Sequence, residues 1–331
     1  MKVFAHRLLA ILSVAVLFCG ASRAQLTAKQ KAENLESFET VWRTVRDRHP
    51  DPQLNGLNWQ AIHDSTKPAV ENARSMSEVR GILSGMVAKL EASHYAIIPD
   101  ELYGAPNHAP REASPGKGTL VRFGNLPEMR LFFDSRSLAD GAGYIHFNEF
   151  LDPASIMPKF EAALGNFRNA PGIIIDIRGN PGGIGIMASG IAGFFIDREG
   201  QKLGEMKTRD TTLKFAIFPR PETYAGPLAI LVDQGSASTS EILAGGLQDL
   251  KRARIFGTRT AGAALPSDIV RLPNGDGFQY AQASYTSASG RVLEGHGVTP
   301  DMVVEQTHDA LLAGRDLVLE AADEWIRSQR H

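Results

Sequence analysis

Residues 172–183 read GIIIDIRGNPGG, and this stretch decides the fold class of the chain. Its first part, residues 172–177, is a continuous apolar run rich in β-branched isoleucine. Such a run is typical of a strand buried on both faces of a parallel sheet. A glycine-rich turn follows at residues 179–185, and the apolar residues 186–196 indicate a helix. A buried strand, a tight turn and a helix in this order predict an α/β domain.

The same pattern recurs on both sides of this stretch. Upstream, a strand is expected at residues 144–147, and an apolar stripe of helical spacing follows it. Downstream, residues 228–232 indicate a second buried strand, the turn GSASTSE follows at 235–241, and a helix is expected at about 240–250. We therefore expect an α/β domain at residues 143–304. A single C-terminal helix is expected within 305–331, with Leu311, Val318, Ala322 and Trp325 facing inward.

The part of the chain before this domain has a different character. Residues 25–103 predict a small helical domain, because apolar residues recur there at helical spacing. Ser75 and Glu78 indicate a capping box at the start of one helix, and Ser93 and His94 come soon after that helix. Residues 104–142 are rich in proline and glycine, with short strand-like pieces, and are expected to be a connector.

The first 24 residues predict an exported protein. Lys2 and Arg7 precede a short apolar run that ends in small residues up to Ala24, which is the pattern of a cleaved signal peptide. A lipid anchor at Cys19 is the alternative, although Phe18 is bulky for such a site. The cleaved signal peptide implies an exported protein, periplasmic or secreted, and no stable membrane insertion is expected after cleavage.

Composition excludes several classes of function. The chain has 331 residues and a formal net charge of −2, and the signal peptide contains three basic residues and no acidic one. The mature chain is therefore acidic and has no basic surface typical of nucleic-acid binding. Cys19 is the only cysteine of the sequence. After cleavage no thiol nucleophile and no cysteine-based metal site is possible.

Two strand-to-helix turns could support chemistry, because such turns direct backbone N–H groups at one point. The first is the glycine turn that ends at Gly183. The second contains three serines, Ser236, Ser238 and Ser240, and serines at a helix start are often only caps. A serine becomes a nucleophile only beside a base. His94 is a candidate base, although a lone histidine is usually structural.

Three segments together carry a family resemblance. DIRGNPGG at 176–183, LVDQGSASTSE at 231–241 and LEGHGVTPD at 293–301 resemble the signature segments of the tail-specific, or C-terminal processing, serine peptidases. That superfamily includes the tricorn protease core and the interphotoreceptor retinoid-binding protein. The resemblance covers roughly residues 144–301 and implies a ClpP/crotonase-like β-β-α spiral.

The resemblance implies roles for individual residues. Ser238 corresponds to the nucleophile, and the amides of Thr239 and Gly183 correspond to the oxyanion hole. One branch of the superfamily uses a serine–lysine dyad, but the lysine position is Ala263 here. Lys251, the only lysine after the nucleophile, has no motif that supports it as a substitute.

The tricorn-like branch resembles this chain more closely, because it uses a Ser-His-Ser-Glu tetrad. Ser93, His94 and Glu294 match its other three positions. In this scheme His94 is the general base, and Glu294 is expected to raise the pKa of His94. Asp249 matches an acidic position of the lysine branch, and we interpret it as structural.

The hypothesis from sequence is an exported serine peptidase that acts on peptides or proteins without a metal or cofactor. A non-catalytic binding protein on the same fold is the alternative, and the intact set of four residues argues against it. A crotonase-like acyl-CoA enzyme shares the fold, but an exported protein would not meet CoA thioesters. The connector is too short for the PDZ domain that many relatives insert. The oligomeric state stays open.

Overall fold

The computed structural model describes residues 25–103, 118–121 and 129–329. The signal peptide expected at residues 1–24, with Cys19, and much of the expected connector lie outside the described residues. In the part of the chain that is described, no helix combines the length and the apolar character needed to cross a bilayer.

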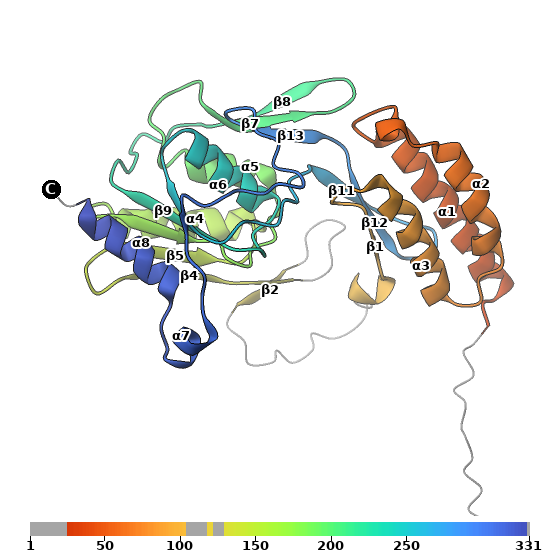
Figure 1. The fold of residues 1–331 in the computed structure, drawn as a ribbon, viewed down its shortest axis with the longest axis horizontal. Coiled ribbons are helices and arrows are strands. Elements are labelled where there is room, and N and C mark those ends of the chain that lie inside the picture. Colours follow the sequence, from red (N-terminus) through yellow and green to blue (C-terminus); the bar gives the residue numbers. More distant parts are fainter. Residues whose placement is uncertain (1–24, 104–117, 122–128, 330–331) are drawn as a thin grey trace, which may run out of the picture.

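A six-stranded sheet forms the centre of the larger of two lobes (Figure 1). Five of its strands are parallel, and β4 pairs antiparallel with β5 at one edge. In sheet order the strands are β14 (Met302–Val303), β10 (Arg254–Gly257), β9 (Leu228–Val232), β6 (Ile173–Asp176), β5 (Gly143–Phe147) and β4 (Phe133–Ser137). The strand β4 falls in the segment expected to be a connector, so that segment contributes to the sheet.

Helices cover both faces of this sheet. Ile173 and Ile175 of β6 pack into the core beneath three helices, whereas Ile174 packs into the core under α8 (Leu317–Ser328). This alternation follows from the two-residue repeat of a strand, and it explains why the whole run is apolar. The three helices are α4 (Pro153–Asn166), α5 (Gly185–Ala192) and α6 (Thr239–Asp249).

A second, three-stranded sheet contacts α5 and α6 and forms the outermost layer of the larger lobe (Figure 1). It consists of β13 (Ser284–Ser287), β7 (Lys202–Lys207) and β8 (Thr212–Ala216). Because this sheet covers the helices from outside, α6 is buried along most of its length, with Thr239 through Leu247 all buried.

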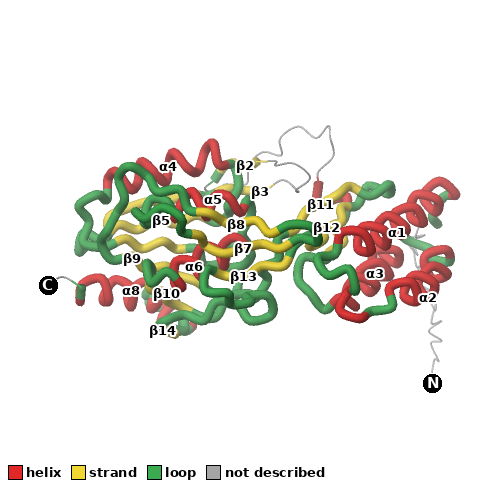
Figure 2. Tube along the Cα trace, turned by 90° about the horizontal axis from the view of Figure 1, so that it is seen from above, coloured by secondary structure: helices red, strands yellow, loops and turns green. Residues whose placement is uncertain are grey.

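The smaller lobe, here called the helical lobe, contains α1 (Ala28–Arg48), α2 (Trp59–Glu71) and α3 (Met76–Val87). Figure 2 shows these helices at one end of the molecule, with β11 and β12 between them and the larger lobe. The short pieces of this lobe are η1 (Leu54–Gly56), η2 (Ala88–Leu90), β1 (Ala96–Ile98) and η3 (Asp100–Tyr103).

The helical lobe includes a part of the chain that sequence analysis assigned to the α/β domain. The strands β11 (Ser267–Arg271) and β12 (Gly277–Ala281) form a sheet with β1. Phe278 and Tyr280 of β12 belong to the same core as Phe38 of α1. Residues 267–281 lie within the expected limits of 143–304 but fold back onto the N-terminal helices.

Two local expectations need correction. The C-terminal helix is two helices, α7 (His308–Leu312) and α8, and Leu311, expected to face inward, is 61% exposed. Gly314 lies between them at φ +70°, a left-handed conformation that ends a helix. At α3, Ser75 Oγ accepts from the Glu78 N–H as expected, but the Glu78 carboxylate accepts from the Arg74 N–H rather than from Ser75.

The described strands include one further pair, β2 (Thr119–Val121) and β3 (Met129–Leu131). The α/β class and the helical region that precedes it are both confirmed.

Candidate active site

Two turns meet at the carboxyl edge of the central sheet, because β6 and β9 are parallel neighbours whose ends lie side by side. Asn180, which is fully buried, joins the turns. Its carbonyl oxygen accepts from the Ala237 N–H at 3.0 Å and from the Ser240 hydroxyl at 2.8 Å. Its side-chain oxygen accepts from the Gly182 N–H at 2.9 Å. One asparagine therefore fixes the glycine turn against the serine turn.

Of the three serines in the second turn, only Ser238 lines a cavity. Ser236 and Ser240 are fully buried, and their hydroxyls donate to the carbonyl oxygens of Ile177 and Asn180. Ser238 has φ +54° and ψ −116°, a strained backbone conformation for a residue with a Cβ. Strain of this kind is often found at functional residues, and here it occurs at the serine beside the cavity.

The amides of Gly183 and Thr239 lie beside Ser238. Within the described ranges, neither N–H has an intramolecular acceptor. The Thr239 hydroxyl donates to the Gly183 carbonyl oxygen at 2.8 Å, so the two amide-bearing turns are held together. Two unpaired N–H groups at the start of α6 and on the adjacent turn can stabilise a developing oxyanion.

The glycines of this turn are required by close backbone approaches. A Cβ on Gly182 would lie 2.8 Å from the Ala237 carbonyl oxygen, and a Cβ on Gly183 would lie 2.4 Å from the Phe150 carbonyl oxygen. Phe150 also bonds to this turn, because its N–H donates to the Gly182 oxygen and its oxygen accepts from the Ile184 N–H. Glu149, the residue before Phe150, is therefore held close to the glycine turn as well.

Glu241 holds the serine turn from the inside. Its fully buried carboxylate accepts from the N–H groups of Ser238, Gly262 and Ala263 and from the Thr260 hydroxyl, at 2.6–3.1 Å. The burial of this carboxyl raises its pKa, although the four hydrogen bonds lower it. Glu241 enters the sequence analysis only as the last residue of the segment 231–241, since nothing local indicates its bonds to residues 260–263.

The histidine comes from the helical lobe and is oriented by two further groups. Ser93 Oγ lies 2.7 Å from His94 Nδ1 and donates to Glu294 Oε2 at 2.9 Å. Glu294 Oε1 also accepts from the Ser93 N–H at 2.7 Å. Since the single hydroxyl proton of Ser93 goes to the carboxylate, Ser93 Oγ accepts from a protonated His94 Nδ1. His94 Nε2 then has the free lone pair that a general base requires.

The pKa of His94 is lowered from its usual value by burial, and the Glu294 charge opposes this shift without overcoming it. Glu294 therefore raises the pKa of His94 as expected, but the larger effect of burial, which the sequence did not indicate, makes the net shift downward. Burial disfavours the charged imidazolium, so His94 is neutral, and able to accept a proton, at pH 7.

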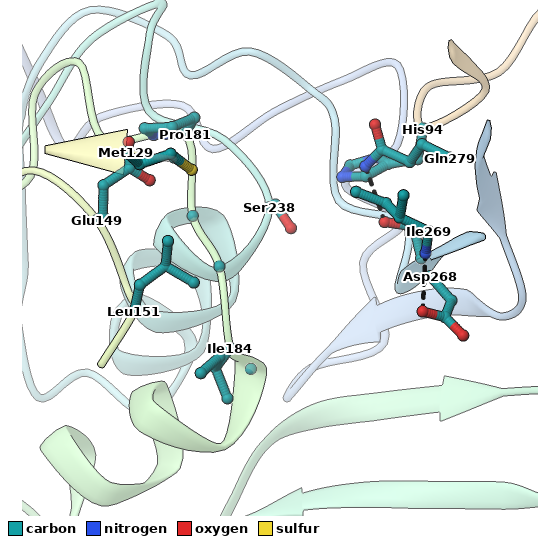
Figure 3. A pocket seen from close by; sticks show the side chains of 14 residues that line it. His94, Met129, Glu149, Leu151, Pro181, Ile184, Ser238, Asp268, Ile269 and Gln279 are labelled. Atoms are coloured by element: carbon teal, nitrogen blue, oxygen red, sulfur yellow. Dashed lines mark hydrogen bonds between the residues drawn. The ribbon is translucent and has the colours of Figure 1, made fainter. Parts of the chain in front are cut away.

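Ser238 and His94 line the same cavity of about 560 Å³, from opposite lobes (Figure 3). Among the described residues no hydrogen bond joins the Ser238 hydroxyl to His94. The predicted site residues thus come from both lobes: Ser238 and Gly183 of the larger lobe and His94 of the helical lobe line the same cavity. Catalytic hydrogen bonds often form only when substrate is bound.

The remaining sequence candidates lie elsewhere. Ala263 adjoins Ser238, since its carbonyl oxygen accepts from the Ser238 N–H at 2.7 Å, so the position of the dyad lysine is close to the nucleophile but lacks an amine. Lys251 follows the far end of α6 from Ser238. Asp249 forms an ion pair with Arg291 and accepts from the Ser289 N–H at that same far end.

One residue of the cavity was missed. Glu149 lines it and belongs to no motif that sequence analysis recognised. No local pattern marks it, because its place at the cavity depends on Phe150 pairing with the glycine turn. Across the residues with described positions, no cluster of histidine, cysteine or carboxylate side chains could hold a metal ion.

A strained serine at a strand-to-helix turn, two free amides and a half-buried histidine facing one cavity define a site of the serine hydrolase class. The comparisons with known proteins are more specific. Residues 141–304 match the model of peptidase family S41, and residues 30–88 match the tricorn protease C1 domain. The chain therefore contains a peptidase S41 domain and a tricorn C1 domain, which supports the superfamily of tail-specific proteases.

Named relatives agree with this family. A carboxyl-terminal-processing protease of Synechocystis sp. is 34% identical over 226 residues, which is 68% of this chain and 51% of that protein. A carboxy-terminal-processing protease of Bartonella bacilliformis is 33% identical over 148 residues, 45% of this chain and 34% of that protein. The chain thus spans only about a third to a half of the length of these relatives.

Solved structures share the fold. The photosystem II D1 C-terminal processing protease aligns with a TM-score of 0.58 at 19% identity, over 85% of this chain and 94% of that one. The tricorn protease aligns with a TM-score of 0.62 at 16% identity, over 91% of this chain and 37% of that one.

Proposed function

We propose that this protein is a serine peptidase in which Ser238 is the nucleophile and His94 the general base. The main support for the proposal is that the free amides of Gly183 and Thr239 lie beside Ser238 at a cavity that His94 lines from the helical lobe. The peptidase S41 domain gives the reaction class, hydrolysis of peptide bonds.

The proposed reaction proceeds through an acyl-enzyme. Ser238 Oγ attacks the carbonyl carbon while its proton passes to His94 Nε2, and the Gly183 and Thr239 amides donate to the oxyanion. Collapse of this intermediate breaks the C–N bond, and His94 gives its proton to the leaving amine. A water molecule then attacks the ester with His94 again as base, which frees Ser238 and the product acid.

Ser93 and Glu294 are proposed as positioning residues. Their hydrogen bonds fix the His94 tautomer and ring orientation, and the Glu294 charge favours the imidazolium as it forms. Glu294 also accepts from the Ala264 N–H at 3.0 Å, so it joins the histidine to the loop that carries Ala263. Its contacts with both lobes support a role in the assembled site.

The test is fluorophosphonate labelling of the mature protein, followed by peptide mapping. A single adduct on Ser238 is expected, and Ser238→Ala should abolish both labelling and peptide hydrolysis. The matched control is Ser267→Ala, since Ser267 lines the same cavity, and it should label normally. An adduct on Ser236 or Ser240, or hydrolysis that survives Ser238→Ala, contradicts the assignment.

The export signal at residues 1–24 is also proposed rather than shown. Sequencing of the N-terminus of protein recovered from outside the cytoplasm should begin at Gln25. Protein that retains residues 1–24 in the cytoplasm contradicts this proposal.

A further inference from the structure

Glu149 is a half-buried carboxyl that lines the cavity holding Ser238 and His94. Within the described residues, no cation and no hydrogen-bond donor pairs with its side chain. Burial therefore raises the pKa of Glu149 to about 7. A carboxyl that is kept partly dry and unpaired is costly for the free protein, and a substrate cation would relieve that cost.

The charges around the cavity favour a cation. Among the described residues that line it, the titratable groups are His94, Glu149 and Asp268, and none is a lysine or arginine. His94 is neutral at pH 7 because burial lowers its pKa. The described wall of the cavity therefore carries negative charge only, and it offers no basic side chain to an anionic substrate group.

The position of Glu149 assigns it to one side of the cleaved bond. In Figure 3, Glu149, Met129 and Pro181 lie on one side of Ser238, whereas His94, Gln279 and Asp268 lie on the other. His94 must protonate the leaving amine, so the leaving half of the substrate occupies the His94 side. The acyl half, which stays on Ser238, then occupies the Glu149 side.

The walls near Glu149 match a particular kind of side chain. Met129, Leu151 and Ile184 are apolar and line the same cavity. Lysine and arginine carry a charged end on a long hydrocarbon stem, and the stem packs well against apolar groups while the charged end reaches a carboxylate. An apolar wall with one carboxyl fits this combination better than it fits a short or anionic side chain.

We infer that Glu149 is a specificity residue that binds the cationic end of a lysine or arginine side chain immediately before the cleaved bond. This inference rests on the proposed peptidase function. The contact forms between an ionised carboxylate and an ammonium or guanidinium group in a partly dry site, where charge-assisted hydrogen bonds are strongest.

The experiment compares kcat/KM for a series of N-acetyl-Ala-Ala-Ala-Xaa aminomethylcoumarin amides at pH 8, with lysine, norleucine, glutamine or glutamate at Xaa. Norleucine keeps the stem of lysine and removes its charge. Acetylation removes the α-ammonium, which is the other possible source of a cation. The wild-type protein is expected to prefer lysine over norleucine by roughly ten- to a hundred-fold, the usual range for a hydrogen bond to a charged group.

Three variants make the test specific. Glu149→Gln should reduce the lysine-to-norleucine ratio to about one and leave the norleucine peptide nearly unchanged. Glu149→Lys should reverse the order and favour glutamate over lysine. Asp268→Asn is the matched control, because it removes the other carboxylate of the cavity on the His94 side, and it should keep the lysine preference.

Several results would overturn the inference. They are a wild-type lysine-to-norleucine ratio near one, a lysine-to-norleucine ratio that Glu149→Gln leaves unchanged, or faster hydrolysis of unacetylated Ala-aminomethylcoumarin amide than of the acetylated lysine peptide. Fluorophosphonate labelling of Ser238 in each variant separates the two hypotheses. Normal labelling without a lysine preference removes the role of Glu149 alone, whereas absent labelling and hydrolysis in the wild type removes the peptidase and this inference together.

Discussion

At the scale of single residues, the two proposed catalytic groups share a backbone property. Ser238 has φ +54° and His94 has φ +62°, although neither is glycine. A residue with a Cβ in such a conformation costs on the order of 1–3 kcal/mol, which the surrounding structure must supply. Asn180 and Glu241 supply it at Ser238 through the hydrogen bonds that fix the turn.

This strain gives a prediction about Ser238. Ser238→Gly and Ser238→Ala should both be inactive, but the glycine variant should be about 1 kcal/mol more stable, because glycine adopts this conformation freely. The comparison isolates backbone strain, since both variants lack the hydroxyl. Urea unfolding followed by circular dichroism measures the difference. A glycine variant that is less stable than the alanine variant would show that the turn is not strained.

In the proposed mechanism the lowered pKa of His94 should set the acid limb of the pH–rate profile. His94 must be neutral to accept a proton, and burial keeps it neutral to lower pH than an ordinary histidine. The kcat/KM of the norleucine peptide should therefore hold as pH falls to about 6.5, the usual histidine value, and drop only below it. The norleucine peptide is used because Glu149, whose pKa is about 7, would add its own titration with the lysine peptide.

The variant Glu294→Gln tests whether the pKa of His94 determines this acid limb of the pH–rate profile. The Glu294 charge raises the pKa of His94 against the effect of burial, so its removal should shift the limb to still lower pH and slow hydrolysis. A limb that stays in place, or a flat profile from about pH 5 to 9 with rate-limiting chemistry, would remove the His94–Glu294 coupling from the mechanism.

At the scale of elements, the turn between β6 and α5 acts through the positions of its backbone groups. Gly183→Ala should lower kcat by about 10²–10³, the usual effect of losing one oxyanion donor. The added Cβ would lie 2.4 Å from the Phe150 carbonyl oxygen, and the residue already has φ +136°, so the amide must move. Hydrolysis of the norleucine peptide measures the loss.

Gly179→Ala is the control for this turn. Gly179 also has a positive φ, +66°, but a Cβ there meets nothing within 4 Å. It should lose some stability through backbone strain alone and keep most of its kcat. Equal losses of kcat in the two variants would mean that general loosening of the turn, rather than the Gly183 amide, limits the reaction.

Helices and strands whose pattern is local could be predicted from the sequence. The apolar run at 172–177 predicted β6 correctly, because a strand that is covered on both faces consists almost entirely of apolar residues. Contacts between residues that are far apart in the sequence could not be predicted. Nothing in residues 267–281 shows that they pack on Phe38, and nothing around Glu149 shows that it faces Ser238. The break at Gly314 was readable, since glycine within a helical pattern is a stop signal.

At the scale of the whole molecule, the site exists only when the two lobes are held together. Ser238 and Gly183 belong to the larger lobe, whereas Ser93 and His94 follow α3 of the helical lobe. Glu294 contacts Ser93 from the loop of the larger lobe that connects β13 to β14. In the proposed mechanism the helical lobe is therefore part of the catalytic machinery, although the matched S41 segment, residues 141–304, does not include it.

A second link between the lobes lies farther from the cavity. Figure 1 shows the hairpin of β7 and β8 reaching toward the helical lobe. In the turn of this hairpin, Arg209 donates from Nε to the His49 carbonyl oxygen at 2.6 Å and from Nη2 to the Arg46 carbonyl oxygen at 2.7 Å. The last carbonyls of a helix lack partners within the helix, and a cation there is favourable.

Arg209→Ala should therefore reduce activity without touching any reacting group. Loss of these two hydrogen bonds frees the end of α1 from the hairpin, so His94 spends less time in position opposite Ser238. We expect kcat to fall roughly three- to ten-fold, the effect of about one ordinary hydrogen bond, because water partly replaces these exposed contacts, and KM should be nearly unchanged. Arg136→Ala is the control, because Arg136 forms a half-exposed ion pair with Asp134 and lies over the Tyr144 ring, and both contacts are within the larger lobe. Arg209→Lys, which keeps the charge but offers a single donor atom, should fall between wild type and Arg209→Ala. If Arg209→Ala and Arg136→Ala have the same kcat as wild type, the hairpin does not position the helical lobe, and the link through Glu294 is sufficient to hold His94 in place.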